Sequence, residues 1–216
     1  VVAGSDHSCA LTTEGGVKCW GRNDDGQLGD GTTTNRSRPT DVVGLASGVT
    51  RLAAGDEHTC AVTEVGGVVC WGLNSSGQLG DGTTAVRLTP VDVSGLTSGV
   101  ASIAVGTFHV CALTTAGGVK CWGSNFNGAL GDGTQTDRPA PVTVFGLSSG
   151  VTQVSAGEEH TCALLTGGGM KCWGDNFYGA LGDGTLTDRL TPTNVSGLTS
   201  GVASITAGGM HSCAMT

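Results

Sequence analysis

The 216-residue sequence predicts an all-β fold, a β-propeller built from four-stranded antiparallel blades. One observation behind this is a period of 51 residues without insertion or deletion, a length typical of propeller blades among stacked repeats. Another is that no window carries a helical stripe, while glycine is too dense for a long helix. We therefore expect a single repeat array over 1–216, with blade-like periods 1–51, 52–102, 103–153 and 154–204 and a partial repeat 205–216.

Each period supplies four short strands, which the second repeat shows in order. The run 48–55 (GVTRLAAG) is apolar and ends at glycine, as a buried strand does. The run 58–63 (HTCAVT) alternates, and after EVGG it is followed by 68–72 (VVCWG), so the two runs form a hairpin. A half-exposed outer strand is expected at 90–96 (PVDVSGL), where valine alternates with polar residues. Four antiparallel strands repeated about an axis describe a propeller blade.

Cysteines recur as pairs on the two strands of each hairpin. If Cys60 lies opposite Cys70, the pairing centre is Val65, and a three-residue loop places glycine where a left-handed conformation is usually needed. A directly opposed pair meets the distance that a disulfide requires, and four bridges would indicate an oxidising, extracytoplasmic setting. The alternative is that cysteine is only a small buried apolar residue. The predicted disulfide cysteines are Cys9 with Cys19, Cys60 with Cys70, Cys111 with Cys121, and Cys162 with Cys172.

Composition and charge argue against several classes of partner. Ten basic and 18 acidic residues give a formal net charge of −8 without a Lys/Arg cluster, so neither nucleic acid nor an anionic membrane surface is expected as a partner. No apolar run approaches the roughly 18 residues of a membrane-spanning helix, and no signal peptide stands at the N-terminus. The chain begins Val-Val inside a repeat, which is consistent with the removal of a leader or further repeats.

Several repeated residues resemble the ligands of metal sites. His58 and Cys60 leave the same face of their strand, and with Cys70 they would offer three zinc-type ligands, but no fourth ligand recurs. A structural histidine, hydrogen-bonded inside the blade, is the favoured interpretation. The stretch 23–31 (NDDGQLGDG) resembles a calcium loop, yet the other repeats keep only its asparagine and final aspartate. Turn formation by these side chains is favoured, so no metal and no cofactor are predicted.

The other repeated residues are also assigned to structure. An arginine follows each LGDGT aspartate by six residues, as Arg36 follows Asp30, and an intra-blade ion pair is the expected use. Each tryptophan follows a mid-strand cysteine, so packing between blades is favoured over an aromatic ligand surface. A catalytic constellation should break the symmetry once, and no such unique cluster of His, Asp and Ser occurs. We therefore predict a non-enzymatic protein without catalytic residues.

The repeat resembles the regulator of chromosome condensation repeat family over essentially the whole chain. That family's pattern G-x-x-H-x-x-A-L, then G-x-V-x-x-W-G-x-N-x-x-G-Q-L-G-x-G, occurs as GDEHTCAV with VVCWGLNSSGQLGDG. The resemblance implies a β-propeller used for protein recognition, in a family that includes an exchange factor for a small GTPase and a bacterial inhibitor of β-lactamases. Exchange activity is not carried over, because the insertion-free acidic chain lacks that factor's wedge and basic segments. The hairpin cysteines are similar to those of secreted bacterial members.

Positions that vary against the repeated background indicate where a partner would dock. Strand direction alternates, so the loop between strands one and two and the loop after strand three emerge on the same face. Both loops mix carboxylates with aromatic residues, whereas the opposite face carries GG turns and SGLTSGV linkers. Such a face suits a protein partner with basic groups, although solvated loop tips would show the same residues. The predicted partner-binding residues are Asp56, Glu57, Phe108, Phe126, Glu158, Glu159, Phe177 and Tyr178.

Function is therefore predicted as recognition of a protein by a secreted or cell-surface propeller, located outside the cell. One alternative is a structural module that self-associates into a larger ring or an extracellular filament, and another is a protein inhibitor of an enzyme. Related propellers usually have seven blades, while 205–216 (ITAGGMHSCAMT) repeats the start of a period and stops before its hairpin turn. An incomplete ring is favoured. Cys213 is left without a partner in its own repeat, either unpaired or available for an interchain bridge.

Overall fold

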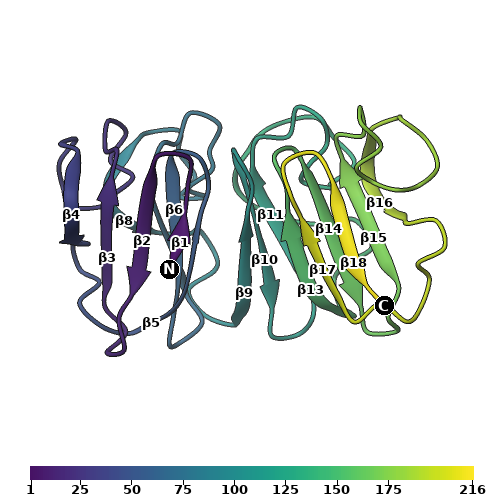
Figure 1. Cartoon of the computed structure of the whole chain (residues 1–216), viewed down its shortest axis with the longest axis horizontal. Helices are drawn as coiled ribbons and strands as arrows, with labels where there is room; N and C mark the ends of the chain where they lie inside the picture. Colours follow the sequence, from purple (N-terminus) through teal and green to yellow (C-terminus); the bar gives the residue numbers. More distant parts are fainter.

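The computed structural model of the chain describes residues 1–216 and contains only strands and turns (Figure 1). Blade 1 holds β1 (Val2–Ala3), β2 (His7–Leu11), β3 (Val17–Gly21) and β4 (Arg36–Asp41). Blade 2 holds β5 (Val49–Ala54), β6 (His58–Thr63), β7 (Val68–Gly72) and β8 (Arg87–Asp92). Blade 3 holds β9 (Val100–Val105), β10 (His109–Thr114), β11 (Val119–Gly123) and β12 (Arg138–Thr143). Blade 4 holds β13 (Val151–Ala156), β14 (His160–Leu165), β15 (Met170–Gly174) and β16 (Arg189–Asn194), and β17 (Ser204–Ala207) with β18 (Ser212–Met215) form a partial fifth sheet.

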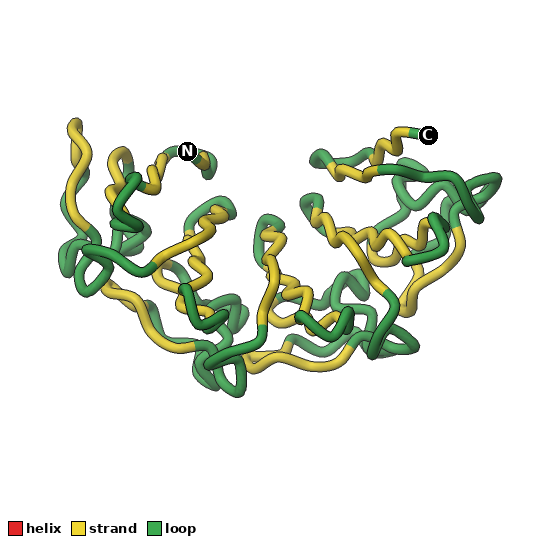
Figure 2. Tube along the Cα trace, turned by 90° about the horizontal axis from the view of Figure 1, so that it is seen from below, coloured by secondary structure: helices red, strands yellow, loops and turns green.

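The sheets stand side by side in an open arc and do not close into a ring (Figure 2). Within each blade the four strands are antiparallel and follow chain order, as the propeller prediction requires. The first strands of successive blades share a channel of about 310 Å³, lined from Ala3 at one end of the arc to Ala207 at the other. No helix in the structure is long and apolar enough to cross a membrane.

The central hairpin of each blade has the register expected from the cysteines. Cys60 pairs with Cys70 across β6 and β7, with a Cα–Cα distance of 4.1 Å, and the two sulfurs are bonded. Blades 1, 3 and 4 repeat this geometry, so all four predicted disulfides are present. In blade 1 the backbone N–H of Thr12 donates to the Gly16 carbonyl and closes a three-residue loop. Gly15 has φ +77° there, which explains why glycine recurs at the end of this loop.

The outer strand lies further toward the N-terminus than the alternating valines predict. In blade 2 it spans Arg87–Asp92, because Arg87 pairs with Gly72 and Val91 with Cys70, across a register shift in β7. Val93 and Leu96, expected inside this strand, follow its end and are buried in the turn toward the next blade. The Val93 N–H donates to the Val68 carbonyl, which folds the chain back over the hairpin end. The alternation after the strand therefore reflects two apolar residues that cover the hairpin, so the outer strand is confirmed but its predicted bounds, 90–96, were wrong.

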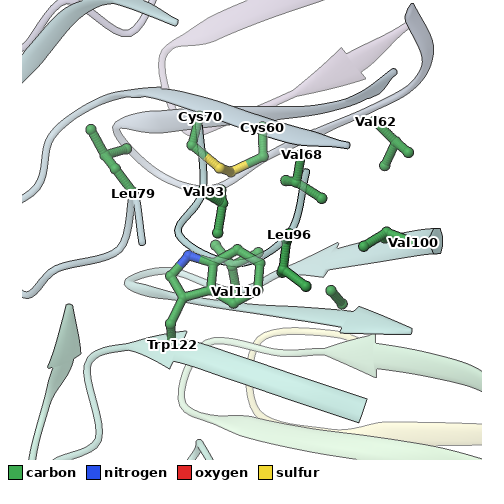
Figure 3. Packing of buried hydrophobic residues seen from close by; sticks show 11 residues of the cluster. Cys60, Val62, Val68, Cys70, Leu79, Val93, Leu96, Val100, Val110 and Trp122 are labelled. Atoms are coloured by element: carbon green, nitrogen blue, oxygen red, sulfur yellow. A yellow bond between two sulfur atoms is a disulfide. The ribbon is translucent and has the colours of Figure 1, made fainter. Parts of the chain in front are cut away.

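Each hydrophobic core joins one blade to its successor. The cluster of blade 2 contains the Cys60–Cys70 disulfide, Val68 and Leu96, and it is completed by Trp122 from blade 3 (Figure 3). The Trp122 indole is fully buried, and its Nε1–H donates to the Gln78 carbonyl at 3.0 Å. Trp71 and Trp173 occupy the equivalent positions in the cores of blades 1 and 3. Packing of tryptophan between blades is therefore as predicted.

Three of the repeated histidines, His7, His109 and His160, bond to the next repeat, which corrects the prediction of a hydrogen bond inside the blade. His7 Nε2 lies 2.9 Å from the Thr59 hydroxyl of the next blade, and His109 Nε2 lies 2.9 Å from the Thr161 hydroxyl. The partner stands 52 residues further along the chain because the histidine side chain crosses to the following sheet. Burial lowers the pKa of His109 to about 4. A neutral imidazole that spans the blade interface is thus part of the packing.

Candidate protein-binding face

One face of the arc carries the variable loops that mix carboxylates with aromatic residues. The loop before each histidine strand and the loop after each tryptophan strand are tied together there: the Ser124 N–H donates to the Phe108 carbonyl, and the Asp175 N–H donates to the Glu159 carbonyl, both at 2.9 Å. Blades 1 and 2 have the same bond, from Arg22 to Asp6 and from Leu73 to Glu57. We call this surface the variable face; it is formed by residues 5–6, residues 22–25 and their equivalents in the later repeats.

Between blades 3 and 4 the variable face brings four predicted residues together. Phe108, Phe126, Glu158 and Glu159 line one small hollow. Phe108 is half-buried, whereas Phe126 is 75% exposed at the rim. The amide Nδ2 of Asn127 donates to the Glu159 carboxylate across the two blades. An aromatic ring and two carboxylates are therefore held side by side on a rigid blade junction.

A second and larger hollow lies between blade 4 and the partial sheet. It has a volume of about 280 Å³ and is lined by Glu158, Glu159, Asp175, Phe177, Tyr178, Gly209 and Met210. The Phe177 and Tyr178 rings meet edge to face with centroids 4.8 Å apart, and both remain about two-thirds exposed. Partial burial, followed by the nearby Asp188 carboxylate, raises the pKa of Asp175. The hollow combines exposed aromatic rings with three acidic side chains and contains no basic residue among those that line it.

In blades 1 and 2, four carboxylates of the variable face lie close to one guanidinium, that of Arg22. Arg22 contacts the Glu57 carboxylate at 2.7 Å and the Asp24 carboxylate at 2.8 Å. The positions equivalent to Arg22 are Leu73, Ser124 and Asp175, so this compensation occurs in blade 1 alone. Predicted residue Glu57 is thereby engaged within the chain, and predicted residue Asp56 lies at the mouth of the central channel rather than in either hollow. The structure therefore places Asp56 and Glu57 outside both hollows, and of the six other predicted residues only Glu158 also lines the channel with Asp56.

The repeated polar residues stabilise the loop after each tryptophan strand. In blade 3 the Arg138 guanidinium contacts the Asp132 carboxylate at 2.8 Å, and the Asn125 amide lies 3.2 Å from the same carboxylate. Burial alone would raise the pKa of Asp132, but hydrogen bonds from Thr134 and Arg138 outweigh it and hold the pKa below its ordinary value. All four blades share this ion pair. The asparagine and aspartate thus organise the loop after the tryptophan strand, as predicted.

Two residues of the larger hollow were missed as site residues. Asp175 and Met210 both line it, and Met210 is 51% exposed. Each occupies a position that varies between repeats, which was the available signal. Their grouping with Tyr178 depends on how blade 4 faces the partial sheet, and the sequence alone does not give that arrangement.

Comparison with known proteins identifies a family model and several relatives that match this chain. The family model described as RCC1-like domain matches residues 1–216. The ultraviolet-B receptor UVR8 of Arabidopsis thaliana is 37% identical over 200 residues, which cover 91% of this chain and 46% of the receptor. The human E3 ubiquitin-protein ligase HERC2 is 35% identical over 222 residues, covering 100% of this chain and 5% of the ligase.

Solved structures give the same result. Human WBSCR16 superimposes with a TM-score of 0.86 at 29% identity, covering 99% of this chain and 56% of that one. Prp20p of Saccharomyces cerevisiae, a structure described with its binding to Gsp1p and histones, gives a TM-score of 0.83 at 26% identity and covers 98% of this chain and 54% of that one. The chain spans about half of these structures and less than half of the curated relatives.

Proposed function

The chain belongs to the family of RCC1-like domains, and on that premise we propose that it is a non-catalytic, protein-binding propeller that recognises its partner through blades 3 and 4 of the variable face. The observation that carries the proposal is the pair of hollows in which Phe126, Phe177 and Tyr178 stand exposed beside Glu158, Glu159 and Asp175. Exposed aromatic residues act as anchors in protein interfaces, and carboxylates without nearby cations attract basic side chains. A partner that presents lysine or arginine beside an apolar residue fits this surface.

Relatives support the general role. Prp20p, with its described binding to Gsp1p and histones, is a protein-binding member of the family. HERC2 is an enzyme by name, but the region similar to this chain makes up only 5% of it. In this chain the repeated His, Asp and Asn side chains are engaged in blade packing and loop formation. The proposed activity of the domain is therefore binding.

We also propose that the protein acts outside the cell, secreted or at the cell surface. Four disulfides, one in each blade, support this because disulfides persist in oxidising compartments. Alkylation of the protein in intact cells, followed by mass measurement, should leave the eight paired cysteines unmodified. Modification of all nine cysteines would contradict an extracytoplasmic location.

The binding site is tested by capturing partners from an extracellular protein fraction and measuring the affinity for the captured protein. Replacing Phe126, Phe177 and Tyr178 together with alanine should weaken binding by at least about tenfold. The matched control is Phe145→Ala, because Phe145 is equally exposed (68%) but lies in the linker on the opposite face. Glu158→Gln with Glu159→Gln should reduce the salt dependence of binding. Unchanged affinity in the triple variant, or equal loss in the control, would contradict this site.

Assembly into a larger ring or filament, and inhibition of an enzyme, remain predictions. Sedimentation over a wide concentration range tests the first of these. A compact monomer at every concentration would contradict self-assembly, whereas species that grow with concentration would support it.

A further inference from the structure

The junction between blades 1 and 2 shows how the variable face holds a guanidinium. Arg22 of blade 1 contacts the Glu57 carboxylate of blade 2 at 2.7 Å, and it also lies close to three carboxylates of its own blade. These are Asp24 at 2.8 Å, Asp6 at 3.8 Å and Asp25 at 3.9 Å. The guanidinium therefore lies where the loops of the two blades meet.

The junction between blades 3 and 4 has the same loops without the arginine. Two periods after Arg22 the chain has Ser124, which lines the small hollow between these blades. Of the four carboxylates only the one on the second blade is kept, as Glu159. The other three positions hold Phe108, Phe126 and Asn127, and all of these residues line the hollow. The hollow thus lies at the place that the guanidinium occupies in the first junction.

The Glu159 carboxylate has no cation beside it in this junction. No lysine or arginine lines the hollow, and the side chain that contacts Glu159 is the neutral amide of Asn127. Glu159 is an exposed residue, whereas its counterpart Glu57 has only 26% of its side chain exposed beside Arg22. The negative charge therefore faces solvent at the position where the first junction places a cation.

An aromatic ring stands next to this carboxylate. Phe126 takes the position that Asp24 has in the first junction, and it is 75% exposed. The turn that carries the ring is fixed by two side chains: the Asn125 N–H donates to the Asp137 carboxylate at 2.8 Å, and the Gln135 amide donates to the Phe126 carbonyl at 2.8 Å. The face of an aromatic ring attracts a cation, arginine more often than lysine. A fixed ring beside a free carboxylate therefore suits a planar cation.

We propose that the hollow between blades 3 and 4 is a recognition site for an arginine side chain of the protein partner. The guanidinium donates hydrogen bonds to the Glu159 carboxylate and stacks on the Phe126 ring. The hollow encloses only about 10 Å³, so it suits a flat group that stays partly exposed rather than an apolar side chain that needs burial. This inference rests on the proposed function, since it names the group by which the partner is recognised.

The test is an NMR titration of the full chain in low-salt buffer, which follows the backbone amide signals of Ser124, Asn127 and Glu159. The probe is the peptide acetyl-Gly-Arg-Gly-amide. One comparison peptide contains citrulline, which has the shape of arginine without its charge, and the other contains lysine, which has the charge without the planar guanidinium. Ser124→Arg is the blocking variant, because it supplies a guanidinium from within the chain as Arg22 does. Ser124→Ala is its matched control, because the bond from Ser124 to Phe108 uses the backbone N–H.

The arginine peptide should bind at least about tenfold more tightly than the citrulline peptide and at least about threefold more tightly than the lysine peptide. Ser124→Arg should weaken binding of the arginine peptide by at least about tenfold, and Ser124→Ala should leave the affinity within about twofold of the parent protein. Equal affinity of the arginine peptide and either comparison peptide would overturn the proposal. Equal binding to the two Ser124 variants would also overturn it, because the peptide would then lie elsewhere.

Failure of this proposal differs from failure of the proposed function. If the three peptides bind alike while the triple alanine variant loses its captured partner, the face binds protein and the arginine site alone is wrong. If the triple variant keeps its full affinity for the partner, the proposed function is wrong, and with it the assignment of the arginine to that partner.

Discussion

His58 is the histidine whose ring lacks the partner that its counterparts have. Thr59 and Thr161 each face a histidine of the preceding blade, but the equivalent position opposite His58 is Val110, which is fully buried. Neither ring nitrogen of His58 has a hydrogen-bond partner. Burial, with smaller effects of His7 and His109, lowers its pKa to about 3. The junction between blades 2 and 3 thus contains a buried imidazole with unused hydrogen-bonding groups.

Val110→Thr should repair this junction. The Thr161 hydroxyl lies 2.9 Å from His109 Nε2 and donates its proton to the Ala129 carbonyl at 2.9 Å, so the imidazole N–H donates to the hydroxyl. Threonine at 110 can make the same two bonds, to His58 and to the Gln78 carbonyl. Each of these two hydrogen bonds should stabilise the folded state by about 0.5 to 1.5 kcal/mol net. A buried hydroxyl without these partners would instead cost roughly 1 to 3 kcal/mol. Because the imidazole also gains its partner, we expect stabilisation by about 1 to 2 kcal/mol.

Urea unfolding of the oxidised protein at pH 7.5 measures this change as a higher midpoint at constant slope. The matched control is Thr161→Val, which creates at His109 the situation of His58 and should lower the free energy of unfolding by about 1 to 3 kcal/mol. If Val110→Thr instead destabilises the protein by 1 kcal/mol or more, the threonine hydroxyl is not bonded and the account of the histidine bridge is wrong.

Three further predictions concern the blades. Gly80→Ala should destabilise the protein by several kcal/mol more than Gly95→Ala. Both residues have φ near +70°, but a Cβ on Gly80 would lie 2.7 Å from Trp122 Nε1, while a Cβ on Gly95 would meet nothing within 4 Å. Equal urea midpoints for the two variants would contradict this. Lowering the pH from 6.5 to about 4 should destabilise the protein, because the folded state holds the histidines neutral while the unfolded chain protonates them. The free energy of unfolding should fall by about 1.4 kcal/mol per pH unit for each buried histidine. Urea midpoints that do not change with pH would contradict this. The histidines concerned are His7, His58, His109 and His160. Replacing Cys111 and Cys121 together with serine should lower the free energy of unfolding by about 2 to 3 kcal/mol, measured by urea unfolding beside a reduced sample of the parent protein; no change would mean that the disulfide in blade 3 does not constrain the unfolded chain.

Local pattern was sufficient to predict the blades, their hairpins and the four disulfides, because each depends on residues within one period. The outer strand was misplaced because Val93 and Leu96 alternate as a strand does, although they are buried by a turn. The histidine partner was missed because it lies in the next period, at a position that varies among Thr59, Val110, Thr161 and Ser212. Comparing each histidine with position i+52 would have found it.

The candidate site was predicted less completely, since charge compensation crosses blades. Glu57 resembles Glu159 in sequence position, but Arg22 from another blade engages the former, while an amide contacts the latter. Such a contact spans 35 residues and depends on side chains present in one repeat only. Variation between repeats therefore identifies the face, and the three-dimensional arrangement decides which part of it carries uncompensated charge.

Because each core is shared between neighbouring blades, the fold restricts how the length of such a chain can change during evolution. The clusters of blades 1, 2 and 3 each take most of their residues from one blade and a tryptophan from the next, so these core contacts join neighbouring periods. A gene duplication or deletion of one whole 51-residue unit leaves each tryptophan that follows a complete blade packed against the core of that blade. An insertion of a few residues within a unit would instead misplace the tryptophan, the histidine and the cysteine of that blade together. Gain or loss of whole units is thus the tolerated change of length. A uniform period of 51 residues is the result expected from such changes.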